Sequence, residues 1–458
     1  MVSDIQTVRM HDTLTQRRKV MQTLGVTCFL GAVMCIPVSQ PEWSGWTTPL
    51  LVVVPGLLTI AVMRFSIISA AYLVQITVFF GVTSLILGSH WEPRLVSSVL
   101  AWSLAITAGT LLGGPSSPRL TSPASRSWLE LRWAHYALCG GLIGVDAFLV
   151  LSDKSGYVAQ LMNGSSTPTG IFGTLSSAAP VVTLTLLLSC IGSDRRSRGA
   201  IGLAGAQVLV LALSGFRGAA GVFIVTALVG AALTLPRGSK WRSRSRLVIV
   251  LPILLILTIS TFVLGANVRN AAANNLWVSS SGTQLFTLDN ALANTSTRLQ
   301  LASSLHTAIE HRNDMAAKDA VSWTTQFQAV VPRFLWPEKP VVDYGQRVSV
   351  AMYGLAYGRS SSTVTTVGDC LLNFGLVGLV LIGLLVGYGF RWTEARVHAG
   401  TGGLSMVAGA IVVYSAIGQE EPIVLILIGI LRNGLLVGGF WAVATLVASR
   451  EIPRVRTR

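Results

Sequence analysis

The sequence predicts an all-α, polytopic integral membrane protein with about 12 transmembrane helices and one large extracytoplasmic loop between helices 9 and 10. The chain of 458 residues is 51% hydrophobic and only 12% charged, about half the charged fraction of a soluble domain. Along the chain recur apolar runs that are each long enough to cross roughly 30 Å of hydrocarbon. These runs are continuous and longer than the alternating strands of a membrane barrel, which favours helices.

The predicted helices follow one another through short connections, except for the long loop after the ninth. They span about 20–37, 47–63, 66–88, 95–112, 134–152, 171–191, 199–214, 217–235, 247–266, 366–389, 403–418 and 422–447. The basic stretch Arg17, Arg18 and Lys19 precedes the first run, and no small-residue cleavage site follows it. We therefore expect a first transmembrane helix there and not a removed signal peptide.

The charge distribution predicts an orientation. Most of the 34 basic residues fall in segments that are cytoplasmic if the N-terminus is, and the short loops 193–198 and 236–246 carry the strongest bias. Both termini are then expected in the cytoplasm and the long loop outside. A net charge of +15 can indicate nucleic acid, but these charges sit in short clusters at helix ends, so no nucleic-acid partner is expected. The five cysteines lie in or beside apolar segments without CxxC spacing, which predicts neither disulfides nor a zinc site.

Three regions follow from this layout: an N-terminal transmembrane bundle of about 9 helices at 1–266, a periplasmic loop at 267–365 and about 3 C-terminal transmembrane helices at 366–458. Within the loop, apolar residues at three- and four-residue steps or their sums predict an amphipathic helix. They are Leu288, Leu292, Leu299, Ala302, Leu305 and Ile309. A second, short helix with Trp323, Phe327 and Val330 on one side must end by Pro332. We expect the loop to cap a cavity between helices; the alternative is a soluble cap without a ligand.

Cations near the predicted outer boundary indicate binding of an acidic ligand. Arg217 lies between Gly215 and Gly218 at an outer turn, where a guanidinium suits phosphate oxygens. The alternative is an arginine that snorkels to the headgroups. The segment 331–340 holds three prolines that fix an extended path carrying Arg333 and Lys339. A rigid strap that re-enters the membrane is the alternative interpretation of that segment.

Two charged residues fall inside predicted membrane helices, where an unpaired charge is costly. Arg432 lies in the last helix, which Glu420 and Glu421 begin, so structural pairing and ligand contact both remain open. Asp146 lies in the fifth helix. It is a protonated core residue, a helix-packing partner or a proton relay, and the sequence does not rank these.

Three residues are candidates for a catalytic base. His306 and Glu310 are four apart on the amphipathic helix and share a face, so the carboxylate can raise the basicity of the imidazole; a solvated surface pair is the alternative. Asp369 follows Gly368 at the start of the tenth helix, where it caps the helix, pairs with an arginine or accepts a proton. No P-loop, Rossmann, HExxH or GxSxG pattern stands in a usable context, so a transferase needs an already activated donor.

Three short motifs resemble the O-antigen polymerase (Wzy-like) and O-antigen ligase families of lipid-linked oligosaccharide transferases. They are Ser214-Gly-Phe-Arg217-Gly, the segment Pro332-Arg333 to Lys339-Pro340, and Gly368-Asp369 followed by Asn373-Phe374-Gly375-Leu-Val-Gly378. These families often show Gly-Glu where this chain has Gly368-Asp369. Some polymerases also carry Arg, ten residues and then Gly in an outer loop, a spacing that Arg347 and Gly358 match.

The resemblance implies an enzyme of the bacterial cytoplasmic (inner) membrane that polymerises oligosaccharide repeat units from undecaprenyl diphosphate into a surface polysaccharide such as lipopolysaccharide O-antigen. It implies that Arg217 and Arg333 bind the diphosphate, with Lys339, Arg347, Arg359 and Arg432 as further diphosphate-binding candidates. It requires no nucleotide, metal or other cofactor. The partners are the lipid-linked glycan, membrane lipid and, as a candidate, a chain-length regulator protein.

Other functions remain open at this stage. A ligase that moves a finished glycan onto another acceptor shares every motif, so only the acceptor separates it from a polymerase. A transporter or lipid flippase is allowed by the helix number and by Asp146, although the two matching halves expected of such carriers are not apparent. A scaffold without enzymatic activity would tolerate the loss of Arg217 or Arg333.

Overall fold

The computed structural model describes an α-helical chain, with no strand among the residues that it describes. Those residues are 47–63, 65–89, 91–113, 133–156, 159, 171–192, 198–215, 217–234, 260–261, 264–265, 300–317, 321–328, 331, 336, 338, 344–355, 362–399, 403–416 and 421–450. Six stretches within them are long and apolar enough to cross a membrane: Ile67–Ile86, Pro93–Leu112, Trp133–Leu151, Ile171–Ile191, Thr365–Val397 and Ile423–Val447. The class predicted from composition, a helical membrane protein, is confirmed.

Most predicted helices are present close to their predicted bounds, because apolar run length sets where a membrane helix begins and ends. The helix predicted at 95–112 is α5 (Pro93–Leu112), for example, and the one at 171–191 is α8 (Ile171–Gly192). The segment 20–37 and nearly all of 247–266 lie outside the described residues. The helix count and the outside location of the loop therefore stay predictions.

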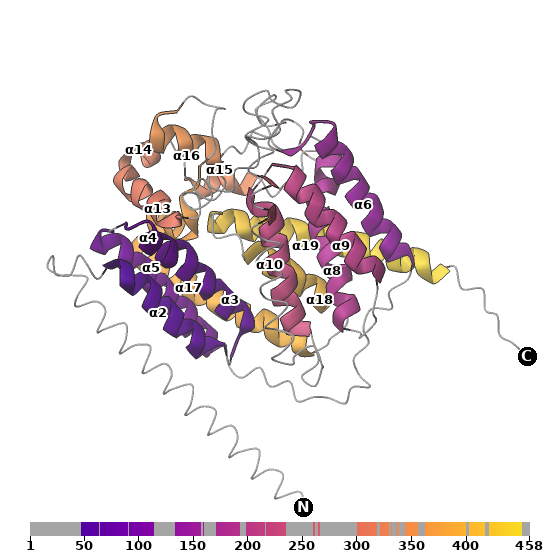
Figure 1. Ribbon diagram of the computed structural model, residues 1–458, viewed down its shortest axis with the longest axis horizontal. Helices are drawn as coiled ribbons and strands as arrows, with labels where there is room; N and C mark the ends of the chain where they lie inside the picture. Colours follow the sequence, from indigo (N-terminus) through magenta and orange to yellow (C-terminus); the bar gives the residue numbers. More distant parts are fainter. Residues whose placement is uncertain are drawn as a thin grey trace, which may run out of the picture. The chain divides into compact units, whose positions relative to one another are not determined.

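The chain forms two compact units that combine segments from all three predicted regions. Unit 1 comprises residues 1–120, 300–312 and 364–395. Its helices are α2 (Thr47–Val62), α3 (Ile67–Ile76), the π-helix η2 (Thr77–Val82), α4 (Thr83–Ile86), α5, α13 (Leu301–Glu310) and most of α17 (Thr365–Ala399). In this unit α2 packs against α3, η2 and α5 (Figure 1).

Close helix packing in unit 1 depends on glycines. A Cβ on Gly387 of α17 would lie 2.1 Å from the backbone oxygen of Ile106 on α5, and one on Gly109 would lie 2.0 Å from the oxygen of Leu384. The Gly383-x-x-x-Gly387 spacing of α17 is therefore used for close packing against α5. The same spacing in α19, Gly434-x-x-x-Gly438, has no such contact, because a Cβ on either glycine would meet no described atom within 4 Å.

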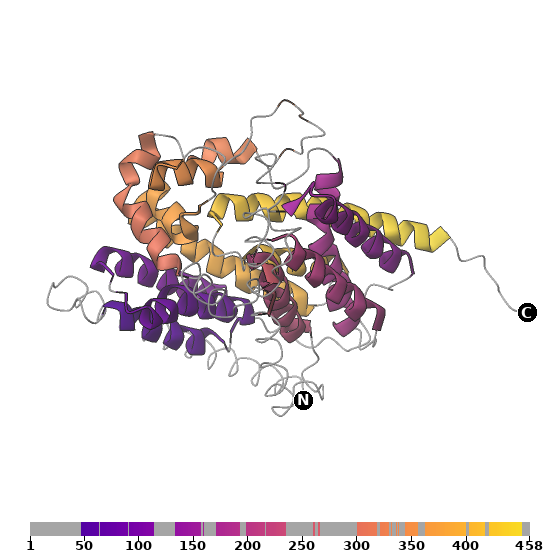
Figure 2. The same cartoon turned by 45° about the horizontal axis from the view of Figure 1, so that its top comes forward.

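Unit 2 comprises residues 121–299, 313–363 and 396–458. Its bundle consists of α6 (Trp133–Leu151), α8, α9 (Arg198–Leu213), α10 (Arg217–Thr234), α18 (Gly403–Ala416) and α19 (Ile423–Arg450). Helix α8 contacts all five others, and Val181, Leu186, Val437 and Trp441 belong to its apolar core. Figure 2 shows the long α19 beside α6.

The predicted tenth helix differs from α17 in two respects. It was expected to end at 389, but α17 continues to Ala399 and includes Arg391, which is buried. The continuation is stabilised because Glu394 lies one turn from Arg391 and its Oε2 accepts a hydrogen bond from the backbone N–H of Ile67, 2.8 Å away. The helix is also interrupted at Gly375, whose φ of 66° and ψ of −169° are essentially restricted to glycine.

The segment predicted as an outer loop contains four described helices: α13, α14 (Arg312–Ala317), α15 (Trp323–Phe327) and α16 (Tyr344–Tyr353). In helix α13 the predicted apolar residues Ala302 and Leu305 are buried, as are Leu301 and Ala308, whereas the predicted Ile309 is half-buried. Helix α15 ends before Pro332 as predicted, and the rings of Trp323 and Phe327 meet edge to face. Residues 288–299 and Val330 lie outside the described residues, and α16 was not predicted.

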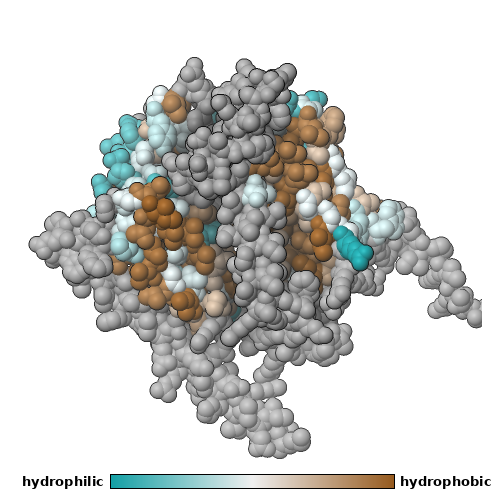
Figure 3. All heavy atoms as spheres, in the orientation of Figure 1, coloured by the Kyte–Doolittle hydropathy of each residue, from teal (hydrophilic) through white to brown (hydrophobic). Residues whose placement is uncertain are grey.

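Large apolar side chains remain on the outside of both units, as expected for surfaces that face lipid. In unit 1 Ile86, Val377 and Leu385 are at least 70% exposed, and in unit 2 Leu151 and Leu435 are 74% and 79% exposed. Figure 3 shows such residues in brown over the helices of each unit. A soluble protein rarely leaves so many large apolar side chains in water, which is a second observation in favour of a membrane location.

Candidate functional site: a polar cluster in unit 2

Two contacting helices, α6 and α19, carry several of the polar groups in unit 2. Near the beginning of α6, the Nε2 atom of His135 lies 3.2 Å from Oγ1 of Thr445, and its ring lies 4.7 Å from that of Trp441; both residues are near the end of α19. Asp146 follows His135 by about 16 Å along α6, and Arg432 precedes Thr445 by about 20 Å along α19. Asp146 and Arg432 thus lie further along two helices of the same bundle that contact each other.

Asp146 is fixed by two neighbouring helices. It is only 6% exposed, and its Oδ1 accepts a hydrogen bond of 2.6 Å from the hydroxyl of Ser176 on α8. Its Oδ2 accepts a second bond, of 2.9 Å, from Nε2 of Gln207 on α9. Gln207 is completely buried, and its own Oε1 has no hydrogen-bond partner among the described residues. The membrane bundle thus contains a buried carboxylate beside an unused amide oxygen.

Tyr414 of α18 connects this carboxylate with a guanidinium. It interacts electrostatically with Asp146, with Arg432 and with Glu421. The buried Nε of Arg432 has no hydrogen-bond partner in the described part of the chain. Glu421, which also acts on Arg432, is exposed. We call Asp146, Ser176, Gln207, Tyr414 and Arg432 the polar cluster.

The polar cluster contains one donor and one acceptor that make no hydrogen bond with the described residues. Arg432 offers a buried donor and Gln207 a buried acceptor, and such groups cost free energy unless a partner satisfies them. A ligand that suits both must carry an anionic oxygen and also an O–H or N–H group. Ionisable residues within a membrane bundle typically mark a substrate or ion site.

The predicted diphosphate-binding residues that the structure describes belong to unit 2. Arg217 begins α10, at the short connection after α9, and Arg432 lies on α19. Helix α15 of the predicted outer loop contacts α19, and Figures 1 and 2 both show it beside the end of α19 where that helix begins. Arg347 lies on α16 and is half-buried. Arg333, Lys339 and Arg359 lie outside the described residues, as does the side chain of Arg217.

The candidate bases all belong to unit 1 instead. His306 and Glu310 share a face of α13 as predicted, with His306 Nε2 lying 3.3 Å from Glu310 Oε1, and their side chains are 29% and 54% exposed. The ring of Trp91 lies 5.6 Å from that of His306. In the same unit, Gln300 at the beginning of α13 donates a hydrogen bond of 2.6 Å to Oγ of Ser89. This helix is therefore anchored to the connection between α4 and α5.

Asp369 is completely buried in the second turn of α17. Its Oδ1 accepts a hydrogen bond of 3.0 Å from Nδ2 of Asn373, which also donates to the backbone oxygen of Asp369. The backbone N–H of Gly368 donates a hydrogen bond to Oγ1 of Thr365. The Gly-Asp motif thus forms a hydrogen-bonded turn just before the break at Gly375.

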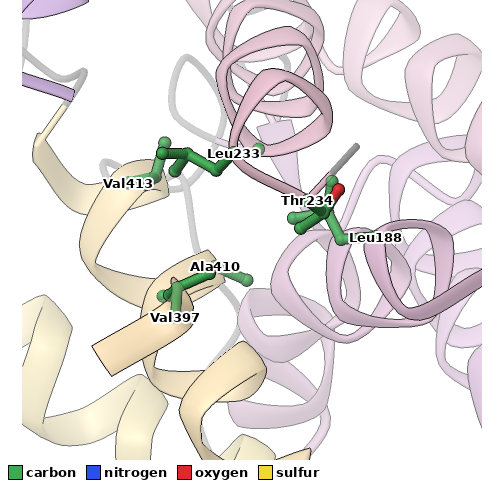
Figure 4. A pocket seen from close by; sticks show the side chains of 8 residues that line it. Leu188, Leu233, Thr234, Val397, Ala410 and Val413 are labelled. Atoms are coloured by element: carbon green, nitrogen blue, oxygen red, sulfur yellow. The ribbon is translucent and has the colours of Figure 1, made fainter. Parts of the chain in front are cut away.

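The pocket that the structure contains in unit 2 is of another kind. Figure 4 shows it lined by Leu188, Leu233, Val397 and Val413, with Thr234 as its polar member. Leu188 and Leu233 lie at the ends of α8 and α10, away from Ser176 and Arg217, which lie near their beginnings. This crevice offers no cation to an acidic ligand. Among the described residues no cluster of His, Cys, Asp and Glu has the composition of a metal site.

Sequence reasoning singled out Asp146 and Arg432 but missed Ser176, Gln207 and Tyr414. These three are isolated polar residues in long apolar runs, where nothing in the pattern separates them from ordinary helix residues. Only the register between helices shows that they meet. A Gln inside a membrane helix is the one signal that was available, since its amide must find partners there.

The fold and the polar cluster define a helical membrane protein with a buried ionisable site in one bundle. Searches found no matching protein-family model, no matching curated protein and no matching solved structure. The resemblance to O-antigen polymerases and ligases therefore rests on short motifs alone.

Proposed function

We propose that this protein is a membrane glycosyltransferase that polymerises oligosaccharide repeat units carried on undecaprenyl diphosphate, with neither nucleotide nor metal. The observation that carries the proposal is the unpaired, buried Nε of Arg432, which lies in a membrane helix that α15 contacts. A guanidinium in that position suits a diphosphate that enters from the lipid, because its fork matches phosphate oxygens and the low dielectric strengthens the contact. Arg217, at the beginning of α10 in the same unit, is the second cation of this site.

The reaction needs little beyond binding and charge stabilisation. An acceptor hydroxyl attacks the anomeric carbon of the donor sugar, the bond from that carbon to the diphosphate oxygen breaks, and the electron pair leaves with the diphosphate. Arg432 and Arg217 stabilise the charge that develops on the leaving group. A base takes the hydroxyl proton, and His306, Glu310 and Asp369 remain the candidates for that role.

The same proposal includes the finer topology. The chain has about 12 transmembrane helices in the bacterial inner membrane, both termini lie in the cytoplasm and the segment 267–365 lies outside. The α15–α19 contact supports a loop that covers the membrane site.

The test is a reaction without nucleotide. Purified protein is incubated with lipid-linked oligosaccharide extracted from the source cells, and the glycan products are separated on a gel. A ladder of lengths is the expected result. A single transferred unit would instead identify a ligase, and the absence of any transfer would overturn the proposal.

A further inference from the structure

Gln207 is the least explained residue of the polar cluster. It is completely buried on α9, and its Nε2 donates its hydrogen bond to Oδ2 of Asp146 over 2.9 Å. Its Oε1 accepts no hydrogen bond from the described residues. An amide carbonyl has two lone pairs, and leaving both unused in a buried position is unfavourable unless a ligand supplies the donor.

The orientation of this amide is imposed by Asp146. Ser176 already donates to Oδ1 of Asp146 over 2.6 Å, so the carboxylate presents an acceptor to the amide. In the structure both carboxyl oxygens of Asp146 accept hydrogen bonds, one from Ser176 and one from Gln207. Rotating the Gln207 amide by half a turn would replace the donor at Oδ2 with Oε1 and lose the bond between the two residues. The Ser176–Asp146 pair therefore holds Nε2 toward Asp146 and points Oε1 away from it.

The fixed acceptor is related to the proposed diphosphate site through two residues. Gln207 donates a hydrogen bond to Asp146, and Tyr414 interacts electrostatically with both Asp146 and Arg432. In the donor lipid, the sugar is joined directly to the diphosphate. A diphosphate on Arg432 would thus bring its first sugar toward Gln207. Hydroxyl and acetamido N–H groups are the donors that such a sugar carries.

We propose that Gln207 recognises the sugar joined to the diphosphate by accepting a hydrogen bond from one of its hydroxyl or acetamido N–H groups, and that Asp146 is the positioning residue that fixes the Gln207 amide. This inference rests on the proposed function and adds a specificity determinant to it. A buried site built to accept a hydrogen bond rejects analogues without the donor strongly, because its own polar group is then left unpaired.

Two paired substitutions separate recognition from packing. In Asp146→Asn with Gln207→Glu, the carboxylate and the amide exchange places, so the bond between them is kept and residue 207 still presents an oriented oxygen. In Asp146→Leu with Gln207→Met, two apolar side chains of similar size replace the pair, which is nearly neutral for stability but removes the acceptor. Ser177→Ala is the matched control, because Ser177 bonds only the Thr174 carbonyl of its own helix.

The variants are assayed with the extracted lipid-linked oligosaccharide, and their folding is followed by thermal unfolding in detergent. We expect the exchanged pair to keep kcat/KM within about 10-fold of wild type, and the apolar pair to lose about 100-fold while unfolding at a similar temperature. Ser177→Ala should transfer like wild type.

Three results would overturn the inference. In the first, the wild type is active and the apolar pair transfers at the same rate. In the second, the wild type is active and the exchanged pair is folded but inactive. The proposed function survives either of these outcomes. A wild-type protein that transfers nothing would overturn the proposed function and this inference together. If the apolar pair does not fold, the exchanged pair alone decides.

Discussion

Two arginines in long apolar helices have opposite surroundings. Arg391 on α17 of unit 1 is only 3% exposed, and Glu394, one turn further on, is 4% exposed and interacts electrostatically with it. The same Glu394 accepts a hydrogen bond from the beginning of α3, so the charges are part of the helix packing. Arg432 on α19 of unit 2 leaves its buried Nε without a partner in the described part of the chain. A charge within a membrane helix is thus a sign of function only where the fold does not already compensate it.

The largest effect is expected at Arg391. Arg391→Ala should leave Glu394 buried without its cation and lower the free energy of unfolding by about 3–5 kcal/mol. Thermal unfolding in detergent measures this loss. Arg391→Ala combined with Glu394→Gln is the control and should recover much of the stability. A single variant as stable as wild type would remove the distinction between the two arginines.

Arg432→Ala should lower kcat/KM for glycan transfer by about 100-fold, the loss typical of one group that stabilises a developing oxyanion. Its thermal unfolding should change less than that of Arg391→Ala, because the Nε makes no hydrogen bond within the described residues and Glu421, which acts on Arg432, is exposed. Steady-state transfer assays and unfolding curves are measured on the same preparation. A variant that unfolds early yet keeps its transfer rate would make Arg432 a second structural arginine.

Arg217→Lys should lower kcat/KM by about 10-fold, because an ammonium cannot bind two phosphate oxygens through a planar fork. Arg217→Ala should be slower still. Transfer rates of the two variants are compared at equal protein concentration. Full activity in the lysine variant would mean that bidentate binding is the wrong account of this residue.

The smallest effect is expected at the exposed pair on α13. Glu310→Gln should change the free energy of unfolding by less than about 0.5 kcal/mol, because its partner His306 and Glu310 itself are in contact with solvent. Since folding is preserved, the transfer rate of this variant tests directly whether the pair provides the base. A large loss of stability would show that α13 depends on this ion pair for its docking.

The sequence was sufficient for helices but not for the contacts between them. The apolar run of α5 predicted its end at residue 112, and the periodic Ala302 and Leu305 are buried on α13. The helix that begins near 366 was predicted to end at 389, because the sequence does not show that Glu394 bonds the beginning of α3. The break at Gly375 was also missed, since glycine is equally common in straight membrane helices.

For the candidate site, too, the sequence indicated some of the residues but not the contacts between them. Arg432 and Asp146 could be found because charge is rare in apolar segments, whatever the fold. Their relation appears only in the fold, where Tyr414 of α18 interacts electrostatically with both. Gln207 became a candidate only through its hydrogen bond to Asp146.

The most direct test of the account is a cryo-EM structure of the purified protein in a lipid nanodisc with undecaprenyl diphosphate. We predict diphosphate density within hydrogen-bonding distance of Nε of Arg432, in the bundle that α6, α9 and α19 form with their neighbours. A headgroup bound elsewhere, with the Arg432 Nε still unpaired beside an empty polar cluster, would contradict it.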